Sequence, residues 1–137
     1  MSAWPEEVGR ALLAAGVPWL PGMLSHGGMR VAVFMEANTM PHSADWLDLR
    51  DDATRGAVRG WLSDRVGGPI SMCFDPDKGA WIVEAESPET PCSPECERFG
   101  VPRMATCHTW PTGKAVAADW REAEARALLA LAREVLA

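Results

Sequence analysis

The residues best suited to chemistry in this chain lie in one short segment, residues 92–108, which reads CSPECERFGVPRMATCH. The segment holds three of the four cysteines and one of the three histidines. Thiolate and imidazole groups are usual ligands of a tetrahedral zinc ion, and a metal clip of this kind stabilises a loop that has few core residues of its own. The spacing therefore predicts a structural zinc site with the ligands Cys92, Cys96, Cys107 and His108.

The last two of these ligands depart from the usual zinc pattern. Cys107 and His108 are adjacent, so in a strand their side chains would point to opposite faces. Cys73 is a substitute fourth ligand, and His26 and His42 are two others. Two interpretations without metal remain open. The cysteines are then unbonded, partly buried small residues, or they form a disulfide such as 92–96 or 96–107, which requires oxidising conditions.

A catalytic thiol is the second chemistry that these residue types suggest. A reactive thiolate needs a nearby imidazole and a group that orients it, and such partners usually meet across a fold. Cys107 or Cys73 with His26 or His42 would supply the pair. No local signature of a cysteine enzyme surrounds any cysteine, so a metal- or thiol-dependent hydrolase that uses the 92–108 segment is an alternative function.

The chain has seven tryptophans and no tyrosine. Because tryptophan is enriched in binding hot spots, the tryptophans outside the helical patterns are candidate partner-binding residues. These are Trp19, Trp46 and Trp110, with Trp81 as a fourth. The remaining three lie on apolar helix stripes, and we expect them in the core: Trp4, Trp61 and Trp120.

Length and charge narrow the classes of protein. A chain of 137 residues with 47% hydrophobic and 23% charged residues is typical of one globular domain. The formal net charge of −6 disfavours direct nucleic-acid binding, which depends on clustered Lys and Arg. No apolar run is long enough to cross a bilayer, and the first ten residues carry acids where a signal peptide carries bases. We expect a cytoplasmic protein that does not bind membranes.

Local patterns predict the elements that position these residues. Apolar residues at helical spacing predict a helix from Trp4 that ends before Gly16, and another that begins at Asp51 or Asp52 and ends at Gly67. The run Arg30–Met35 predicts a strand, and residues 70–86 predict a β-hairpin with the turn DPDKG. The last helix starts at a capping box, Asp119 with Glu122, and has Glu124 on its solvated side.

These elements predict an α+β fold with a small antiparallel sheet, including the 70–86 hairpin, packed against about three helices. The whole chain, 1–137, then forms a single domain. The cysteine segment belongs to an insertion at about 87–114, between the hairpin and the last helix. Residues 103–110 predict one more strand.

Three pieces of the chain carry a resemblance: LLAAGVPWLPGML at 12–24, LDLRDDATRGAV at 47–58, and the alanine-rich last helix with its start ADWREAEA. Their order resembles small uncharacterised proteins encoded by phages and prophages of high-GC bacteria. Those proteins usually pass from the hairpin to the last helix directly, whereas this chain inserts residues 87–114. The resemblance implies an accessory protein that meets a host defence system.

The leading functional hypothesis is therefore a non-enzymatic, phage-type accessory protein, with a structural zinc site as its one expected cofactor. Its expected partner is a host protein in the host cytosol, for example a defence or regulatory protein that it inhibits. The hydrolase is one alternative. A minor structural component of a virion is another, and it would form a symmetric oligomer.

Overall fold

A computed structural model describes residues 3–32, 41, 44–88 and 111–137 of the chain. Its elements, in chain order, are α1 (Trp4–Ala15), α2 (Asp52–Val66), β1 (Ser71–Asp77), β2 (Ala80–Glu86), β3 (Thr112–Ala117) and α4 (Trp120–Val135). The three strands form one antiparallel sheet in the order β1-β2-β3. The predicted α+β fold, an antiparallel sheet packed against three helices, is confirmed.

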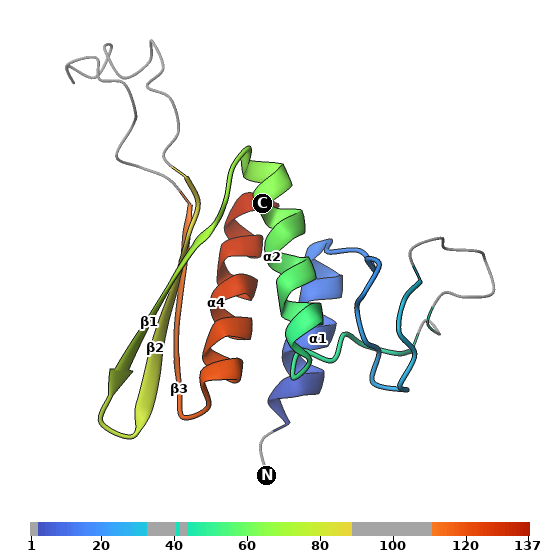
Figure 1. Ribbon diagram of the computed structural model, residues 1–137, viewed down its shortest axis with the longest axis horizontal. Helices are drawn as coiled ribbons and strands as arrows, with labels where there is room; N and C mark the ends of the chain where they lie inside the picture. Colours follow the sequence, from blue (N-terminus) through green and yellow to red (C-terminus); the bar gives the residue numbers. More distant parts are fainter. Residues whose placement is uncertain (1–2, 33–40, 42–43, 89–110) are drawn as a thin grey trace.

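The elements form three layers (Figure 1). Helix α4 lies against β2 and β3 on one side and against α1 and α2 on the other, so all three helices lie on one side of the sheet. Because α4 is the middle layer, it is buried around most of its circumference. Its many alanines permit this, since small side chains let neighbouring elements approach closely. Its buried residues are Ala123, Glu124, Ala125, Ala127, Leu128, Leu129, Leu131 and Ala132.

The predicted helix ends agree with the structure. Gly16 ends α1 at φ 111°, a left-handed conformation that favours glycine. The Asp51 side chain accepts a hydrogen bond from the Thr54 amide and so caps α2. At the start of α4, Asp119 accepts from the Arg121 amide and so caps the helix as predicted. The reciprocal half of the predicted capping box is wrong, because Glu122 accepts from the Arg126 side chain rather than from the Asp119 amide.

The hairpin of β1 and β2 is confirmed, with a tighter turn than predicted. Asp75, Pro76 and Asp77 all belong to β1, and the turn itself is only Lys78 and Gly79. Gly79 has φ 71°, a left-handed conformation that favours glycine. Pro76, which lacks an N–H group, is tolerated because β1 lies at the edge of the sheet.

Strand β3 was not predicted. Its first residues, 112–114, fall within the range expected for the insertion, and its sequence TGKAVA is small and has few β-branched residues. The reason for the small residues is tertiary. A Cβ atom on Gly113 would overlap the backbone of α4 at Ala127 and Leu131, so β3 pairs and packs only with glycine at this position. The strand predicted at 103–110 lies outside the described residues.

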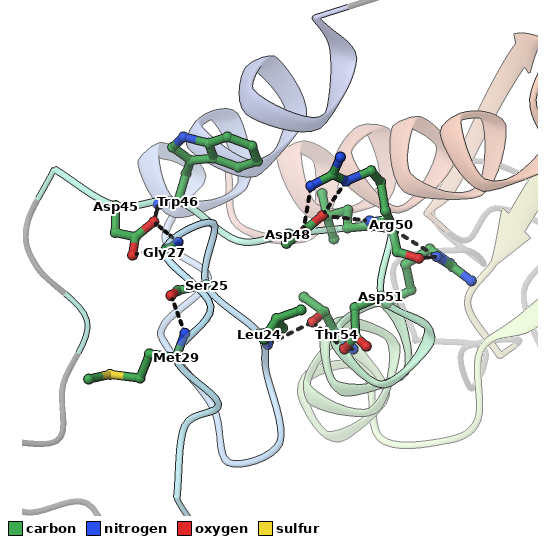
Figure 2. A network of polar contacts seen from close by, with 12 residues as sticks. Leu24, Ser25, Gly27, Met29, Asp45, Trp46, Asp48, Arg50, Asp51 and Thr54 are labelled. Atoms are coloured by element: carbon green, nitrogen blue, oxygen red, sulfur yellow. Dashed lines mark hydrogen bonds and ion pairs between the residues drawn. The ribbon is translucent and has the colours of Figure 1, made fainter.

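Hydrogen bonds hold the described parts of the long connection between α1 and α2 (Figure 2). The Leu24 amide donates to the Thr54 hydroxyl, 2.9 Å away, and that hydroxyl donates to Asp51. Further along, the Asp45 carboxylate accepts from the amides of Gly27 and Trp46. The strand predicted at Arg30–Met35 appears in the described residues only as an isolated bridge between Leu24 and Arg30, and residues 33–35 lie outside them.

Candidate functional site

An open hollow lined by three aromatic side chains is the most distinctive surface feature of the described residues. Phe74 from β1, Trp81 from β2 and Trp120 from the first turn of α4 line a space of about 360 Å³. The alternation of side chains along the hairpin places Phe74 on the same face as Val83, its partner in β2, which is fully buried. The hollow therefore lies on the helix-facing side of the sheet, where the hairpin extends past the start of α4.

Two of the three aromatic rings contact each other and leave apolar surface accessible. The rings of Phe74 and Trp120 are 6.2 Å apart at an interplanar angle of 74°, an edge-to-face arrangement. Phe74 is 37% exposed, which makes it one of the few large hydrophobic residues left open to solvent among the described residues. A second molecule could therefore bury aromatic surface here without rearranging the fold.

Trp120 is held in place by a buried arginine. The Arg55 guanidinium lies 5.0 Å from the centre of the Trp120 ring. It also donates to Glu124, 3.2 Å away, and to the carbonyl oxygen of Leu49, 2.8 Å away, and it pairs with Asp52. One side chain thus joins α2, α4 and the preceding loop, and it fixes one wall of the hollow.

Two predictions about α4 are wrong. Glu124 was placed on the solvated side, but it is 8% exposed and pairs with Arg55, which supplies the counter-charge that burial requires. Trp120 was expected in the core, but it is only partly buried and lines the open hollow. The first error arises because α4 lies between two layers, and the second because Trp120 lies at the start of α4, which the hairpin extends past.

A second, polar hollow of about 430 Å³ lies beside α1. Two residues named in the sequence as candidates, His26 and Trp46, line this hollow. Their rings are stacked, with centroids 4.2 Å apart. Burial raises the pKa of Asp45 there, but hydrogen bonds from Trp46, Ser25 and Gly27 outweigh that effect and hold the pKa below its usual value. The carboxylate is therefore ionised and occupied in fixing the surrounding loops. The residues lining this hollow are Glu6, Arg10, His26, Gly27, Ala44, Asp45 and Trp46.

The structure places the predicted partner-binding tryptophans in different environments. Trp46 is 7% exposed. Trp19 is partly buried and packs against the hydrophobic core. Trp110 lies outside the described residues, and so do the four predicted zinc ligands, Cys92, Cys96, Cys107 and His108, together with His42. Within the described ranges, no group of three or more metal-ligating side chains is close enough to hold an ion.

Cys73, the substitute ligand and candidate nucleophile, lies on β1 and faces away from the helices. Its pKa is raised, first by the negative charge of Asp75 and then by desolvation, with smaller effects from Glu84 and Glu86. The thiol is therefore protonated at neutral pH, the opposite of an activated nucleophile. The loop that carries His26 lies on the far side of the helices from the sheet (Figure 1).

Sequence reasoning did not find the aromatic hollow. Trp81 was named as a candidate partner-binding residue, but nothing local indicated that it and Phe74 would meet the first turn of α4. The available signal was the pairing of the two hairpin strands. Phe74 and Trp81 lie on the same face of these neighbouring strands, so their rings lie close together.

Comparison with known proteins adds no relative. No protein-family model matches the chain, and no curated protein and no solved structure is significantly similar to it. Among the described residues, no helix is long and apolar enough to cross a membrane.

Proposed function

We propose that this protein is a non-enzymatic binding protein that captures a large apolar side chain of a partner protein in the hollow of Phe74, Trp81 and Trp120. The observation that carries the proposal is the hollow itself: three aromatic side chains line it, and Phe74 is left 37% exposed. Exposed aromatic clusters of this kind are typical of protein-binding hot spots.

The size and openness of the hollow favour a side chain over a free small molecule. Its volume of about 360 Å³ lies at the lower end of the range of roughly 300–1,000 Å³ that is usual for ligand pockets. An open space of this size leaves much of a drug-sized ligand in water. A side chain that projects from a partner protein is a better fit, since the surrounding partner surface covers the rest.

The charge beside the hollow indicates the chemistry of the partner. The Arg121 guanidinium lies 5.0 Å from the centre of the Trp120 ring and makes no ion pair with a described residue. A carboxylate next to the captured side chain would pair with it. Conversely, a methylated or quaternary ammonium ligand is disfavoured, because two guanidinium groups, those of Arg55 and Arg121, already lie against Trp120.

The narrower role expected from the sequence belongs to the same proposal. A phage-type accessory protein that inhibits a host defence or regulatory protein would use such a hollow to hold an exposed apolar segment of that protein. This role depends on the identity of the partner, which binding chemistry alone does not specify.

Selection of peptides from a random display library tests the proposal. We expect the selected peptides to share a Phe, Trp, Leu or Met next to an Asp or Glu. Phe74→Ala should weaken their binding by at least about tenfold, as expected for loss of a hot-spot aromatic residue. Met29→Ala is the matched control, because Met29 is 38% exposed and Phe74 37%, and Met29 does not line the hollow.

Thermal denaturation of both variants would show that each is folded. Selected peptides that bind Phe74→Ala as tightly as the unchanged protein would refute the assignment of the hollow. Selection of lysine-rich peptides without a common apolar residue would refute the proposed chemistry.

A further inference from the structure

The face of the sheet turned away from the helices carries a second, separate surface. Met72, Val83 and Ala85 point toward the core. Because side chains alternate along a strand, the residues next to them in sequence point to the opposite face. No described element covers it (Figure 1). Its central residues are Cys73, Asp75 and Asp77 on β1, Ile82, Glu84 and Glu86 on β2, and Thr112, Lys114 and Val116 on β3.

An apolar pair occupies two of the three positions in one row of this face, beside Asp75. Ile82 of β2 is directly opposite Val116 of β3, and Val116 is 58% exposed, more than any other large hydrophobic residue described. A β-branched residue packs well against its cross-strand neighbour, but its outer surface is normally covered by another part of the protein or by a partner. The pair thus offers a partner a short apolar strip.

Acidic side chains predominate around the strip, and Lys114, next to Val116 on β3 and opposite Glu84, is the exception. Asp75, Asp77, Glu84 and Glu86 share the face with a single basic residue, Lys114. The negative potential acts on this face itself, since Asp75, Glu84 and Glu86 all raise the pKa of the Cys73 thiol that lies among them. The charge on this face therefore favours a basic occupant.

We propose that the outward face of the sheet binds a basic, amphipathic segment of a protein, with Lys or Arg side chains pairing with Asp75, Glu84 and Glu86 and an apolar side chain covering Ile82 and Val116. The face lies on the opposite side of the sheet from the aromatic hollow. It is therefore a second interaction surface, independent of the function proposed above.

The same charges argue against the other occupants of such a face. Nucleic acid and anionic lipid surfaces carry phosphates, which the carboxylates repel. A second copy of this chain would bring an identical acidic face into contact with the first. The second copy remains as an outcome of the test.

Fluorescence anisotropy with three labelled seven-residue probes tests the proposal in low salt. The probes are KVKVKVK, its charge-reversed counterpart EVEVEVE, and the polar counterpart KSKSKSK. We expect the first to bind most tightly, with an affinity that falls as salt increases. The second should not bind, and the third should bind at least about fivefold more weakly because it lacks apolar side chains.

Matched variants locate the binding. Glu84→Gln with Glu86→Gln should weaken the binding of KVKVKVK by at least about fivefold through loss of two charges, and Val116→Ser should weaken it severalfold. Asp64→Asn with Glu134→Gln is the control, because it changes the net charge by the same amount at exposed positions of α2 and α4. This control should leave the affinity within about twofold.

Equal effects of the two double variants would overturn the proposal, since they would show attraction to net charge alone. Equal binding of KVKVKVK and KSKSKSK would overturn the role of the apolar strip. Sedimentation of the protein as a dimer that Val116→Asp converts to a monomer would assign the face to a second copy and would equally overturn it.

Discussion

At the scale of single residues, Gly113 sets how closely the sheet approaches α4. A Cβ atom at this position would overlap the carbonyl oxygen of Ala127 and the amide of Leu131. These are backbone atoms, so no side-chain rotation relieves the overlap. β3 and α4 would have to separate, and the buried alanines between them would lose contact.

We predict that Gly113→Ala destabilises the protein by about 1–3 kcal/mol or more, the range for overpacking a core. Gly60→Ala is the matched control, because Gly60 lies within α2 and a Cβ there meets no atom within 4 Å. That change should stabilise the protein by up to about 1 kcal/mol, since alanine favours the helix. Urea denaturation measures both, and equal stability of the two variants would contradict the close packing.

Arg55 is the second residue on which the packing depends. It is 2% exposed, and its guanidinium makes hydrogen bonds to Glu124 and to two loop carbonyl groups. Removal of the arginine leaves the Glu124 carboxylate buried without a counter-charge. A buried charge of this kind is much more costly than the loss of a surface ion pair.

Arg55→Ala should therefore lower the free energy of unfolding by about 3–5 kcal/mol. Arg59→Ala, one turn later in α2 and exposed, should change it by less than about 0.5 kcal/mol. Chemical denaturation at neutral pH compares the two. In the double variant Arg55→Met with Glu124→Leu, part of the lost stability should return. A double variant less stable than Arg55→Ala would show that the ion pair is not the cause.

At the scale of elements, local patterns were sufficient to predict structures whose contacts are between residues close in the sequence. The caps of α1 and α2 and the β1–β2 hairpin follow from glycine, aspartate and alternating apolar residues within a few positions of one another. The third strand and the burial of Glu124 could not be predicted in this way. Each depends on a contact with an element far along the chain: β3 on the backbone of α4, and Glu124 on Arg55 of α2.

The aromatic hollow has the same origin. Phe74 and Trp81 are neighbours across the hairpin because the turn is only two residues long, whereas the predicted turn DPDKG would place them on opposite faces. Trp120 joins them only because β3 returns the chain to the same end of the sheet. Since β3 was not predicted, α4 could not be placed relative to the hairpin. The zinc site predicted at Cys92, Cys96, Cys107 and His108 lies outside the described residues and stays a prediction.

The cap of α2 makes stability depend on pH. Burial raises the pKa of Asp51, but hydrogen bonds from Arg30 and Thr54 outweigh that effect, so the pKa lies below its usual value. A carboxyl group with a lowered pKa in the folded state stabilises the protein fully above its unfolded-state pKa of about 3.9. That contribution disappears as the pH falls through the folded-state value.

We predict that the melting temperature falls steeply below about pH 4 and that Asp51→Asn makes the fall shallower. The variant should also be less stable than the unchanged protein at pH 7, where the ionised carboxylate is lost. Thermal denaturation followed by circular dichroism between pH 7 and pH 2.5 measures both. If the melting temperatures of the two proteins fell in parallel as the pH was lowered, the role of Asp51 would be contradicted.

At the scale of the whole molecule, the layers produce two different surfaces on one sheet. On the helix side, the hairpin extends past the start of α4 and leaves the aromatic rings of Phe74, Trp81 and Trp120 open. On the other side, no described element covers the strands, and Ile82 and Val116 lie on a mainly acidic face. A small sheet covered on one face thus supplies both proposed interaction sites.

The indole N–H signals of the seven tryptophans allow the central claim, capture of an apolar side chain in the aromatic hollow, to be measured directly. The measurement is a ¹⁵N NMR titration with N-acetyl-phenylalanine, which has an aromatic ring and a carboxylate. We predict saturable shifts of the Trp81 and Trp120 signals, no shift of buried Trp4, and loss of the effect in Phe74→Ala. Shifts confined to Trp46, which lines the polar hollow, or shifts that persist in Phe74→Ala, would contradict the claim.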